Sequence, residues 1–345
     1  MKVALNLEPK SGPFGGGNSF IANFVESLKE SGHEVHFDLN TEGLDFIFIL
    51  DPRWRHPLAK FTVATVARYV IKNKKTLVIH RINECDERKN SNFMNRKLRL
   101  TNYIADSTIF VSSWLQSLNL VHQNQLKNRL RTDVVIKNGS DSRLFYPDKD
   151  NNWDGKEKLK LVTHHWSSNV MKGLDLYQCL DDFLIDPLIS ERFEFTYIGN
   201  LPNEARFVNA RVLPPLHGAE LANELRKHHV YITGSINEPG GNHQNEGGLS
   251  GLPIIFLDSG SMSEYCDGYG IKIASPQELP IALEKVSKNY SELREQMFSF
   301  PNTAEKMVYE YIAHLQVLDE QRENLVRERN LLHDPWNFLR LQIPM

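Results

Sequence analysis

The sequence predicts an α/β protein with two Rossmann-like domains that face a cleft, and three observations support this. Short apolar, β-rich runs alternate with amphipathic helical patterns along the chain, which indicates parallel strands joined by helices. Several of these runs, such as residues 76–79, are apolar almost throughout, as is typical of strands buried on both faces of a sheet. A polar stretch at residues 148–157 interrupts the alternation, which resumes at Leu159, so we expect a linker there.

The expected elements follow from these patterns in chain order. The predicted strands span residues 2–7, 34–38, 45–50, 76–80, 108–111, 133–137, 158–163, 193–198, 229–233, 253–257 and 270–273. The predicted helices between them span residues 18–31, 57–73, 92–103, 171–183, 218–228 and 276–296. A further helical pattern runs from Asn302 to about residue 330, with Asn302 as its cap and Glu305 three positions on.

The length of 345 residues suits two domains at about 150 residues each. We expect an N-terminal domain over residues 1–150, a C-terminal domain over residues 151–302, and a helix with a tail over residues 303–345. Because parallel strands end at a common edge, the cleft between two such domains is the expected ligand site.

Composition narrows the class of protein. Apolar residues make up 41% of the chain and charged residues 24%, which excludes a disordered protein. No apolar run approaches the roughly 20 residues of a membrane span, and the start of the chain has no signal-peptide pattern. Three cysteines lie far apart, which excludes a disulfide scaffold and a zinc finger. We therefore expect a cytoplasmic protein.

Charge is unevenly distributed. Residues 1–150 contain 22 basic and 16 acidic side chains, whereas the whole chain has a net charge of -3. This asymmetry predicts that the first half meets something anionic. The segment 88–99 is basic, with apolar residues interspersed, and we expect it to contact an anionic membrane surface or a phosphorylated lipid. Nucleic-acid binding is disfavoured because no aromatic–basic platform is apparent.

A glycine-rich loop follows the first predicted strand. Gly15, Gly16 and Gly17 allow a sharp turn and a close backbone approach to a ligand, and Asn18 or Ser19 can cap the next helix. The spacing is neither G-x-G-x-x-G nor G-K-[ST]. A dinucleotide-binding dehydrogenase or epimerase and a P-loop NTPase are therefore excluded.

The most informative motif lies between the predicted strands 229–233 and 253–257. Glu238 and Glu246 enclose a proline and a run of glycine and polar residues, and Gly247 and Gly248 follow. Such a loop supplies backbone N–H groups for phosphate oxygens and two carboxylates for sugar hydroxyls.

With these residues the chain resembles the GT-B glycosyltransferases of the family-4 type (glycosyl transferases group 1). Their signature is a pair of glutamates separated by seven residues and followed by G-x-P, matched by Glu238, Glu246 and residues 251–253. Their N-G-x-D-x-x-x-F-x-P segment is matched by residues 138–147, and their Lys-Gly by residues 172–173. The first-loop glycines also match, so the resemblance covers nearly the whole chain in order.

The resemblance implies a role for each matching residue. Glu238 would bind the donor sugar near the reacting carbon, Glu246 would hold the ribose hydroxyls, and Lys172 would neutralise charge on the leaving phosphate. His80, which ends the predicted strand 76–80, would reach the donor sugar. The implied catalytic set is thus Glu238, His80 and Lys172. The implied donor-binding residues are Gly16, Gly17, His164, His165, Lys172, Gly199, Leu213, Gly240, Gly241, Glu246, Gly247 and Gly248.

One feature departs from the family pattern. The family usually has an arginine about five residues before the lysine, but residues 163–171 contain none. We expect His164, His165 or the hydroxyl of Ser167 to take its place, a histidine being a weaker and pH-dependent cation. The histidine pair has no carboxylate or cysteine at a useful spacing, so no metal site is expected.

The resemblance therefore implies transfer of a sugar from a UDP- or GDP-linked donor to an unidentified glycan, lipid-linked or protein acceptor. It further implies retention of configuration, no metal or cofactor, and a C-terminal helix that crosses back to the first domain. The alternative is a GT-B-like protein that binds a nucleotide sugar without turnover, which the missing arginine favours.

Overall fold

The computed structural model describes residues 1–10, 12, 16–53, 55–120, 132–203, 205–332 and 334–343. It divides the chain into two compact units. Unit 1 comprises Met1–Lys10, Phe20–Lys137 and Met307–Met345, and unit 2 comprises Ser11–Ser19 and Asn138–Lys306. The C-terminal segment therefore belongs to the first unit, which confirms the predicted crossing.

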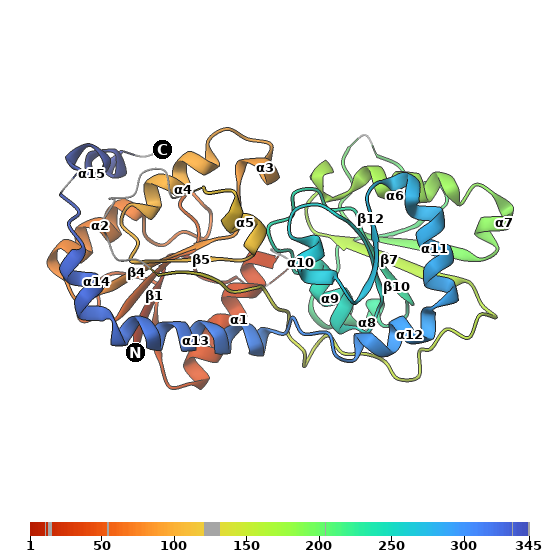
Figure 1. Cartoon of the computed structure of the whole chain (residues 1–345), viewed down its shortest axis with the longest axis horizontal. Coiled ribbons are helices and arrows are strands. Elements are labelled where there is room, and N and C mark those ends of the chain that lie inside the picture. Colours follow the sequence, from red (N-terminus) through yellow and green to blue (C-terminus); the bar gives the residue numbers. More distant parts are fainter. Residues whose placement is uncertain are drawn as a thin grey trace. The chain divides into compact units, whose positions relative to one another are not determined.

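The described strands of unit 1 form a parallel sheet in the order β2-β1-β3-β4-β5-β6, of which β1, β4 and β5 are labelled in Figure 1. The strands are β1 (Lys2–Leu5), β2 (Glu34–His36), β3 (Phe46–Ile49), β4 (Leu77–Ile82), β5 (Ser107–Phe110) and β6 (Thr132–Val135). The helices of the first part of the chain are α1 (Gly16–Glu30), α2 (Val63–Lys72), α3 (Asp86–Lys89), α4 (Met94–Asn102) and α5 (Ser113–Ser117). The C-terminal helices are α13 (Ala304–Glu320), α14 (Arg322–Glu328) and α15 (Pro335–Gln342).

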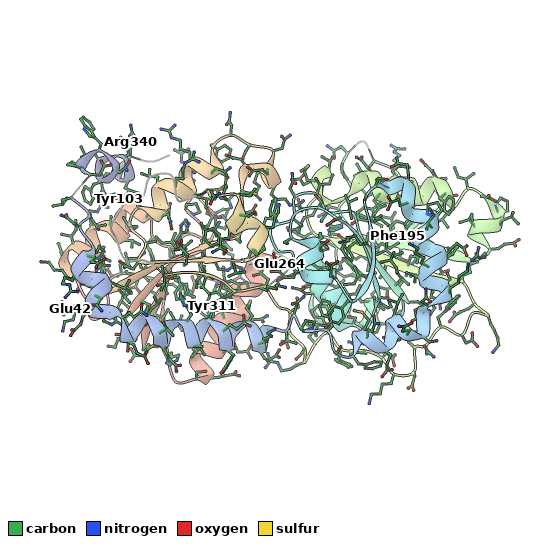
Figure 2. All side chains as sticks on the ribbon, viewed as in Figure 1. Glu42, Tyr103, Phe195, Glu264, Tyr311 and Arg340 are labelled. Atoms are coloured by element: carbon green, nitrogen blue, oxygen red, sulfur yellow. The ribbon has the colours of Figure 1, made fainter. Side chains whose placement is uncertain are left out.

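Successive residues of these strands enter opposite cores, because side chains alternate across a strand. Phe46 and Phe48 of β3 pack with α1 and with Tyr311 of α13, which is labelled in Figure 2. Ile47 and Ile49 pack on the other face, in a cluster that includes residues of α2 and Leu341 of α15. Both faces are covered, as the unbroken apolar runs predict.

The described strands of unit 2 form a second parallel sheet, in the order β12-β11-β10-β7-β8-β9. They are β7 (Leu159–His165), β8 (Phe193–Gly199), β9 (Arg211–Leu213), β10 (Val230–Thr233), β11 (Ile254–Leu257) and β12 (Gly270–Ile273). The α-helices are α6 (Leu174–Phe183), α7 (Pro187–Ser190), α8 (Gly218–Leu225), α9 (His243–Leu249), α10 (Met262–Cys266), α11 (Leu279–Lys288) and α12 (Tyr290–Met297). Short 3-10 turns lie at Val170–Lys172 and Pro276–Glu278.

This sheet is also buried on both faces. Leu161 of β7, Phe195 of β8 and Ile232 of β10 share one core with α6 and α11. Val162, which follows Leu161, and Tyr231, which precedes Ile232, lie in the opposite core with residues of α8, α10 and α12. The predicted α/β class with two Rossmann-like units is therefore confirmed.

The structure differs from the predicted elements at a few points. Strand β9 was not predicted, since residues 211–213 are short and partly exposed. The single helix predicted from Asn302 is instead α13 and α14, which are separated at Gln321. Thr303, rather than the predicted Asn302, caps α13, because Thr303 Oγ1 accepts the N–H of Lys306 at 3.1 Å. No helix in the described ranges is both long and apolar enough to cross a bilayer.

Candidate functional site

Three of the predicted site residues of unit 2 lie near the point where the strand order reverses across its sheet. Strands β7 and β10 are neighbours, but β8 and β9 extend the sheet on one side and β11 and β12 extend it on the other. Open α/β sheets bind ligands at the carboxyl ends of strands at such a switch point. Lys172 follows β7, and Glu238 and Glu246 follow β10, so the topology brings these three residues to one edge.

Lys172 and Glu238 form an ion pair at this edge, with 3.3 Å between Nζ and Oε2. The Glu238 side chain is 6% exposed and that of Lys172 is 25% exposed. The two segments that carry these residues are also joined by a backbone hydrogen bond, in which the N–H of Ile236 donates to the carbonyl of Met171 at 2.9 Å. A buried carboxylate is thus compensated by a cation that still reaches solvent.

Two glycines permit this approach of the two segments. Gly173 has φ +102°, and a Cβ there would lie 2.5 Å from the carbonyl carbon of Gly234. A Cβ on Gly234 would lie 2.7 Å from Leu176 Cβ. The matched Lys172-Gly173 dipeptide therefore has a structural reason, since only glycine lets the lysine turn meet the end of β10.

The Glu238 backbone is fixed independently of its side chain. The N–H and the hydroxyl of Ser261 both donate to the Glu238 carbonyl at 2.8 Å. Gly260 has φ +65°, and a Cβ there would lie 2.4 Å from the Glu238 nitrogen. The loop that carries Glu238 is therefore anchored to the segment after β11.

Glu246 is oriented through a chain of three side chains. Its Oε2 lies 2.6 Å from His164 Nε2, and His164 Nδ1 lies 3.1 Å from the hydroxyl of Tyr231. Burial raises the pKa of the Tyr231 hydroxyl well above its usual value, so this group keeps its proton and can donate it to Nδ1. His164 then carries its proton on Nε2 and donates to Glu246.

His165 faces a different set of partners, because adjacent strand residues point to opposite faces. Its Nε2 lies 2.6 Å from the Tyr177 hydroxyl and 3.2 Å from Thr163 Oγ1. Burial lowers the pKa of His165 well below its usual value, and the neighbouring His243 and Lys172 lower it further. The His165 ring is therefore neutral at neutral pH.

The glycines after Glu246 lie in α9 and face packed rings. A Cβ on Gly247 would lie 2.4 Å from the Tyr231 ring, and one on Gly248 would lie 2.7 Å from the Phe300 ring. Gly241 lies before the helix, where a Cβ would come within 2.6 Å of His243 Nδ1. A larger residue at any of these positions would force its neighbours to move.

Buried amide oxygens also surround this loop. The side-chain NH2 groups of Gln244 and Asn245 donate to the Gly241 carbonyl, at 2.6 Å and 3.3 Å. That of Asn242 donates to the Gly16 carbonyl at 3.2 Å. Among the described residues, Asn242 Oδ1, Gln244 Oε1 and Asn245 Oδ1 accept no hydrogen bond. The loop therefore retains unused acceptors for donor groups such as hydroxyls.

The remaining predicted donor-binding residues have separate places in unit 2. Gly199 ends β8 with φ +146°, and a Cβ there would lie 2.0 Å from the His165 carbonyl oxygen. Leu213 ends β9. The Gly240 carbonyl accepts from the Asn138 side chain at 2.5 Å. Gly17 is exposed, with open space around it.

His80 lies in unit 1, inside a strand. The prediction that it ends its strand is wrong, because β4 pairs with β5 as far as Ile82 and Phe110. The His80 side chain is fully buried, and Nδ1 lies 3.1 Å from Asn102 Oδ1. This contact holds the ring between the sheet and α4.

A second switch point, between β1 and β3 of unit 1, was not predicted. Asn6 Nδ2 donates to the Asp51 carbonyl at 2.8 Å, and Asn6 Oδ1 accepts the Leu50 N–H at 2.7 Å. Asp51 and Arg53 form an ion pair at 2.5 Å. The sequence signal that could have revealed this switch point is the presence of polar residues directly after apolar strands.

In neither unit do described His, Cys, Asp or Glu residues form a group of three able to hold a metal.

The fold and this edge can be compared with known proteins. No family model and no curated protein sequence matches the chain. Among solved structures, sucrose-phosphate synthase from Thermosynechococcus elongatus is similar, with a TM-score of 0.64 and 13% identity over 92% of this chain and 98% of that one. The chain has the GT-B fold.

Two further GT-B structures match over the same share of the chain. HepE from Anabaena, solved in complex with UDP-glucose, has a TM-score of 0.66 at 13% identity, over 92% of this chain and 100% of HepE. AviGT4, a glycosyltransferase involved in avilamycin A biosynthesis, has a TM-score of 0.57 at 13% identity, over 92% and 98% of the two chains. These likenesses concern the fold.

Proposed function

We propose that this GT-B protein is a glycosyltransferase that transfers a sugar from a nucleotide-diphospho-sugar to an acceptor. The observation that carries the proposal is that two glutamates at the switch point of unit 2 are each held by a basic side chain, Glu238 by Lys172 and Glu246 by His164. Carboxylates there accept sugar hydroxyls, and a lysine neutralises phosphate. The similarity to HepE, solved with UDP-glucose, favours a UDP-linked donor over a GDP-linked one.

Each pair has a proposed task. His164 occupies one oxygen of Glu246 and holds the carboxylate so that the other oxygen can accept the ribose hydroxyls. Glu238 binds hydroxyls of the donor sugar, and its ion pair keeps Lys172 beside the reacting centre. When the bond to the diphosphate breaks, Lys172 and the N–H groups of the loop stabilise the departing charge.

The chain offers limited means to replace the absent arginine. His165 is buried and neutral, whereas residues 166–170 are exposed beside Lys172. We propose that Lys172 supplies the positive charge at the diphosphate without a metal, and that transfer retains configuration. The acceptor is a glycan, a lipid-linked sugar or a protein. The predicted membrane contact of residues 88–99 stays a prediction.

A second candidate is a GT-B protein that binds a nucleotide sugar without turnover. The absence of an arginine from residues 163–171 favours it, because the diphosphate then has fewer fixed cations. Release of UDP from UDP-sugars distinguishes the two candidates, since only an enzyme turns the donor over.

The test is a binding and turnover screen with UDP- and GDP-linked sugars. Ligand binding to the folded form raises Tm, and we expect a clear rise with one nucleotide class. A charged hydrogen bond contributes about 1.5–3 kcal/mol, so Glu246→Ala should weaken nucleotide binding at least about ten-fold. Glu238→Ala should chiefly reduce turnover.

The control is Glu191→Ala, which removes an exposed glutamate of unit 2 and should match the wild type. Lys172→Met should reduce the preference for UDP over UMP, because the lysine is proposed to contact the terminal phosphate. Unchanged nucleotide binding in Glu246→Ala, with turnover preserved in Glu238→Ala, would show that the assignment is wrong.

A further inference from the structure

A pocket in unit 1, formed mainly by helices and by Pro52 of the loop after β3, has an unusual lining. It lies between α2, α4 and α15 and has a volume of about 180 Å³. For comparison, a dry apolar cavity of about 150 Å³ binds benzene. Its apolar lining comes from Pro52, Val63, Ala64, Leu100, Leu341 and Ile343. The pocket is therefore large enough for part of an apolar chain.

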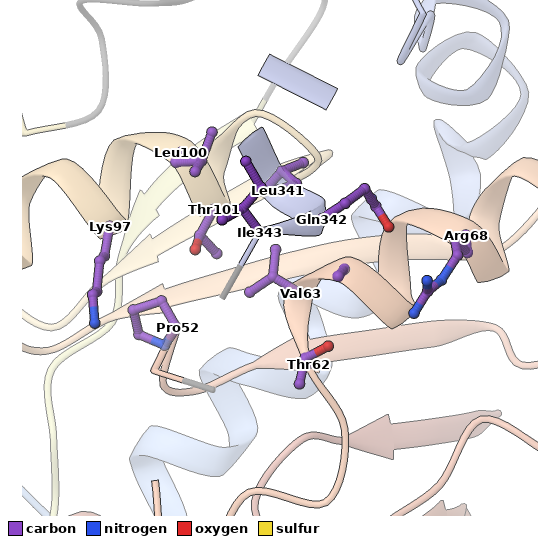
Figure 3. Close-up of a pocket in the computed structure, with 11 residues that line it drawn as sticks. Pro52, Thr62, Val63, Arg68, Lys97, Leu100, Thr101, Leu341, Gln342 and Ile343 are labelled. Carbon is purple, nitrogen blue, oxygen red and sulfur yellow. The ribbon is translucent and has the colours of Figure 1, made fainter. Parts of the chain in front are cut away.

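Two cations border this apolar lining. Arg68 of α2 and Lys97 of α4 also line the pocket, and Figure 3 shows them on opposite sides of Val63, Leu341 and Ile343. The polar lining consists of Thr62, Thr101 and Gln342, and no acidic residue of the described ranges contributes. An apolar interior with cations at its edge suits a ligand that has an apolar chain and an anionic group.

The charged side chains of the three helices around the pocket are all basic. The helices carry Arg68, Lys72, Arg96, Lys97, Arg99 and Arg340, and none contains an acidic residue. None of these six cations forms an ion pair with any residue in the described ranges. Basic side chains left unpaired on one face attract an anionic surface.

Helix α15 adds an apolar stripe to this face. Phe338 and Leu341 pack inward against the core shared with α2, and α15 contacts both α2 and α4. Trp336 is 74% exposed, Leu339 54% and Ile343 62%. Trp336 and Leu339, three residues apart, lie on one side of α15, and Ile343 follows as its C-terminal cap, where it also lines the pocket. Arg340, labelled in Figure 2, follows Leu339 in α15 and is also exposed.

The segment 88–99, by contrast, turns its apolar residues inward. Met94 and Leu98 are buried in a core cluster, and Arg88 is 5% exposed. Its exposed large apolar side chain is Phe93. The larger exposed apolar surface is therefore on α15 and its C-terminal cap.

We propose that this face of unit 1 binds a membrane surface that contains anionic lipids. Trp336, Leu339 and Ile343 enter the headgroup region, as in interfacial amphipathic helices. The pocket takes an apolar chain of one lipid, whose anionic group binds Arg68 and Lys97. This proposal is independent of the proposed sugar transfer.

The test is vesicle flotation of the full chain, with phosphatidylcholine alone and with phosphatidylcholine containing phosphatidylglycerol. We expect binding to the anionic vesicles at low salt, and a loss of binding as salt screens the charges. Arg68→Gln/Lys97→Gln should weaken partitioning about thirty-fold, at about five-fold for each cation. Trp336→Ser/Leu339→Ser/Ile343→Ser should weaken it more than about a hundred-fold.

Matched controls come from unit 2. Ile185→Ser/Leu188→Ser removes two apolar side chains that are 68% and 71% exposed, and Lys149→Gln/Lys158→Gln removes two exposed cations. Both should bind vesicles like the wild type. Thermal unfolding of each variant establishes that it is folded, which the exposure of the changed residues leads us to expect.

A second arm tests the pocket itself, by calorimetry with decyl phosphate as a monomer and with inorganic phosphate. The wild type should bind decyl phosphate only, and Ala64→Phe, which fills the pocket, should not bind it. Equal binding by Ala64→Phe, or no flotation with anionic vesicles at low salt, overturns the proposal. The proposal is also overturned if the protein does not bind vesicles but forms a dimer that is lost in the α15 variant, because the face would then join two copies of the chain.

Discussion

Gly247 offers a sharp test of how α9 is packed. A Cβ at this position would lie 2.4 Å from Tyr231 Cγ and 2.5 Å from Cδ2. Tyr231 is fully buried, and its hydroxyl contacts both the backbone and the side chain of His164. The ring is therefore held at both ends, and a methyl group forces it or the helix to move.

The expected cost of Gly247→Ala is the balance of two effects. Overpacking a core costs about 1–3 kcal/mol, whereas replacing a helical glycine by alanine gains about 1 kcal/mol. Because the Tyr231 ring is held at both ends, the overpacking cost falls in the upper part of that range, about 2–3 kcal/mol, and we expect a net loss of about 1–2 kcal/mol in the free energy of unfolding, together with weaker nucleotide binding through displaced His164. Urea denaturation measures the first quantity and calorimetry with UDP the second.

Gly17→Ala is the matched control, since Gly17 lies in the first turn of α1 and a Cβ there meets no atom within 4 Å. This variant should be as stable as the wild type or slightly more stable. Gly247→Ala with wild-type stability would refute the packing of α9 described above.

Three further predictions concern stability and are read by urea denaturation. Thr303→Ala should cost about 1 kcal/mol, because the α13 cap is lost. Arg329→Met should cost about 3–5 kcal/mol, because Asp106, which is 1% exposed, loses its 2.7 Å ion pair. Burial lowers the pKa of His228 and of His229 from 6.5 to about 4. The unfolded chain then binds more protons, so stability is full above pH 6.5 and falls by roughly 2–3 kcal/mol for each ring as pH drops toward 4.

Each of these predictions has its own control. Thr303→Ser keeps the capping oxygen and should stay close to the wild type. Adding Asp106→Asn to Arg329→Met should recover part of the loss, because no buried charge is left alone. Replacing His228 and His229 by asparagine should flatten the acid limb of the stability curve; an unchanged limb would contradict the assignment of protonation.

Most of the fold could be predicted because the strands are buried on both faces and so appear as unbroken apolar runs. Residues 211–213 could not be recognised, since Arg211 and Val212 are exposed and β9 is an edge strand of three residues. The end of α13 also escaped prediction. There Arg322 donates to the backbone carbonyls of Lys75 and Asp45, a tertiary contact that local sequence does not encode.

The candidate site was partly predictable for the same physical reason. Lys172, Glu238 and Glu246 lie in the segments that follow β7 and β10, and the parallel topology brings them to one edge. Tyr231 was not singled out, because a tyrosine in an apolar strand is expected to be a core residue. Only the structure shows that its hydroxyl contacts His164. Because successive side chains of a strand point to opposite faces, His164 and His165 cannot both face Glu246.

The most direct measurement is a crystal structure of the full chain with UDP bound. We predict that the nucleotide lies at the carboxyl ends of β7 and β10, with a ribose hydroxyl within hydrogen-bonding distance of the Glu246 carboxylate and the terminal phosphate beside Lys172. UDP bound elsewhere, such as at the loops after β1 and β3, would contradict the account.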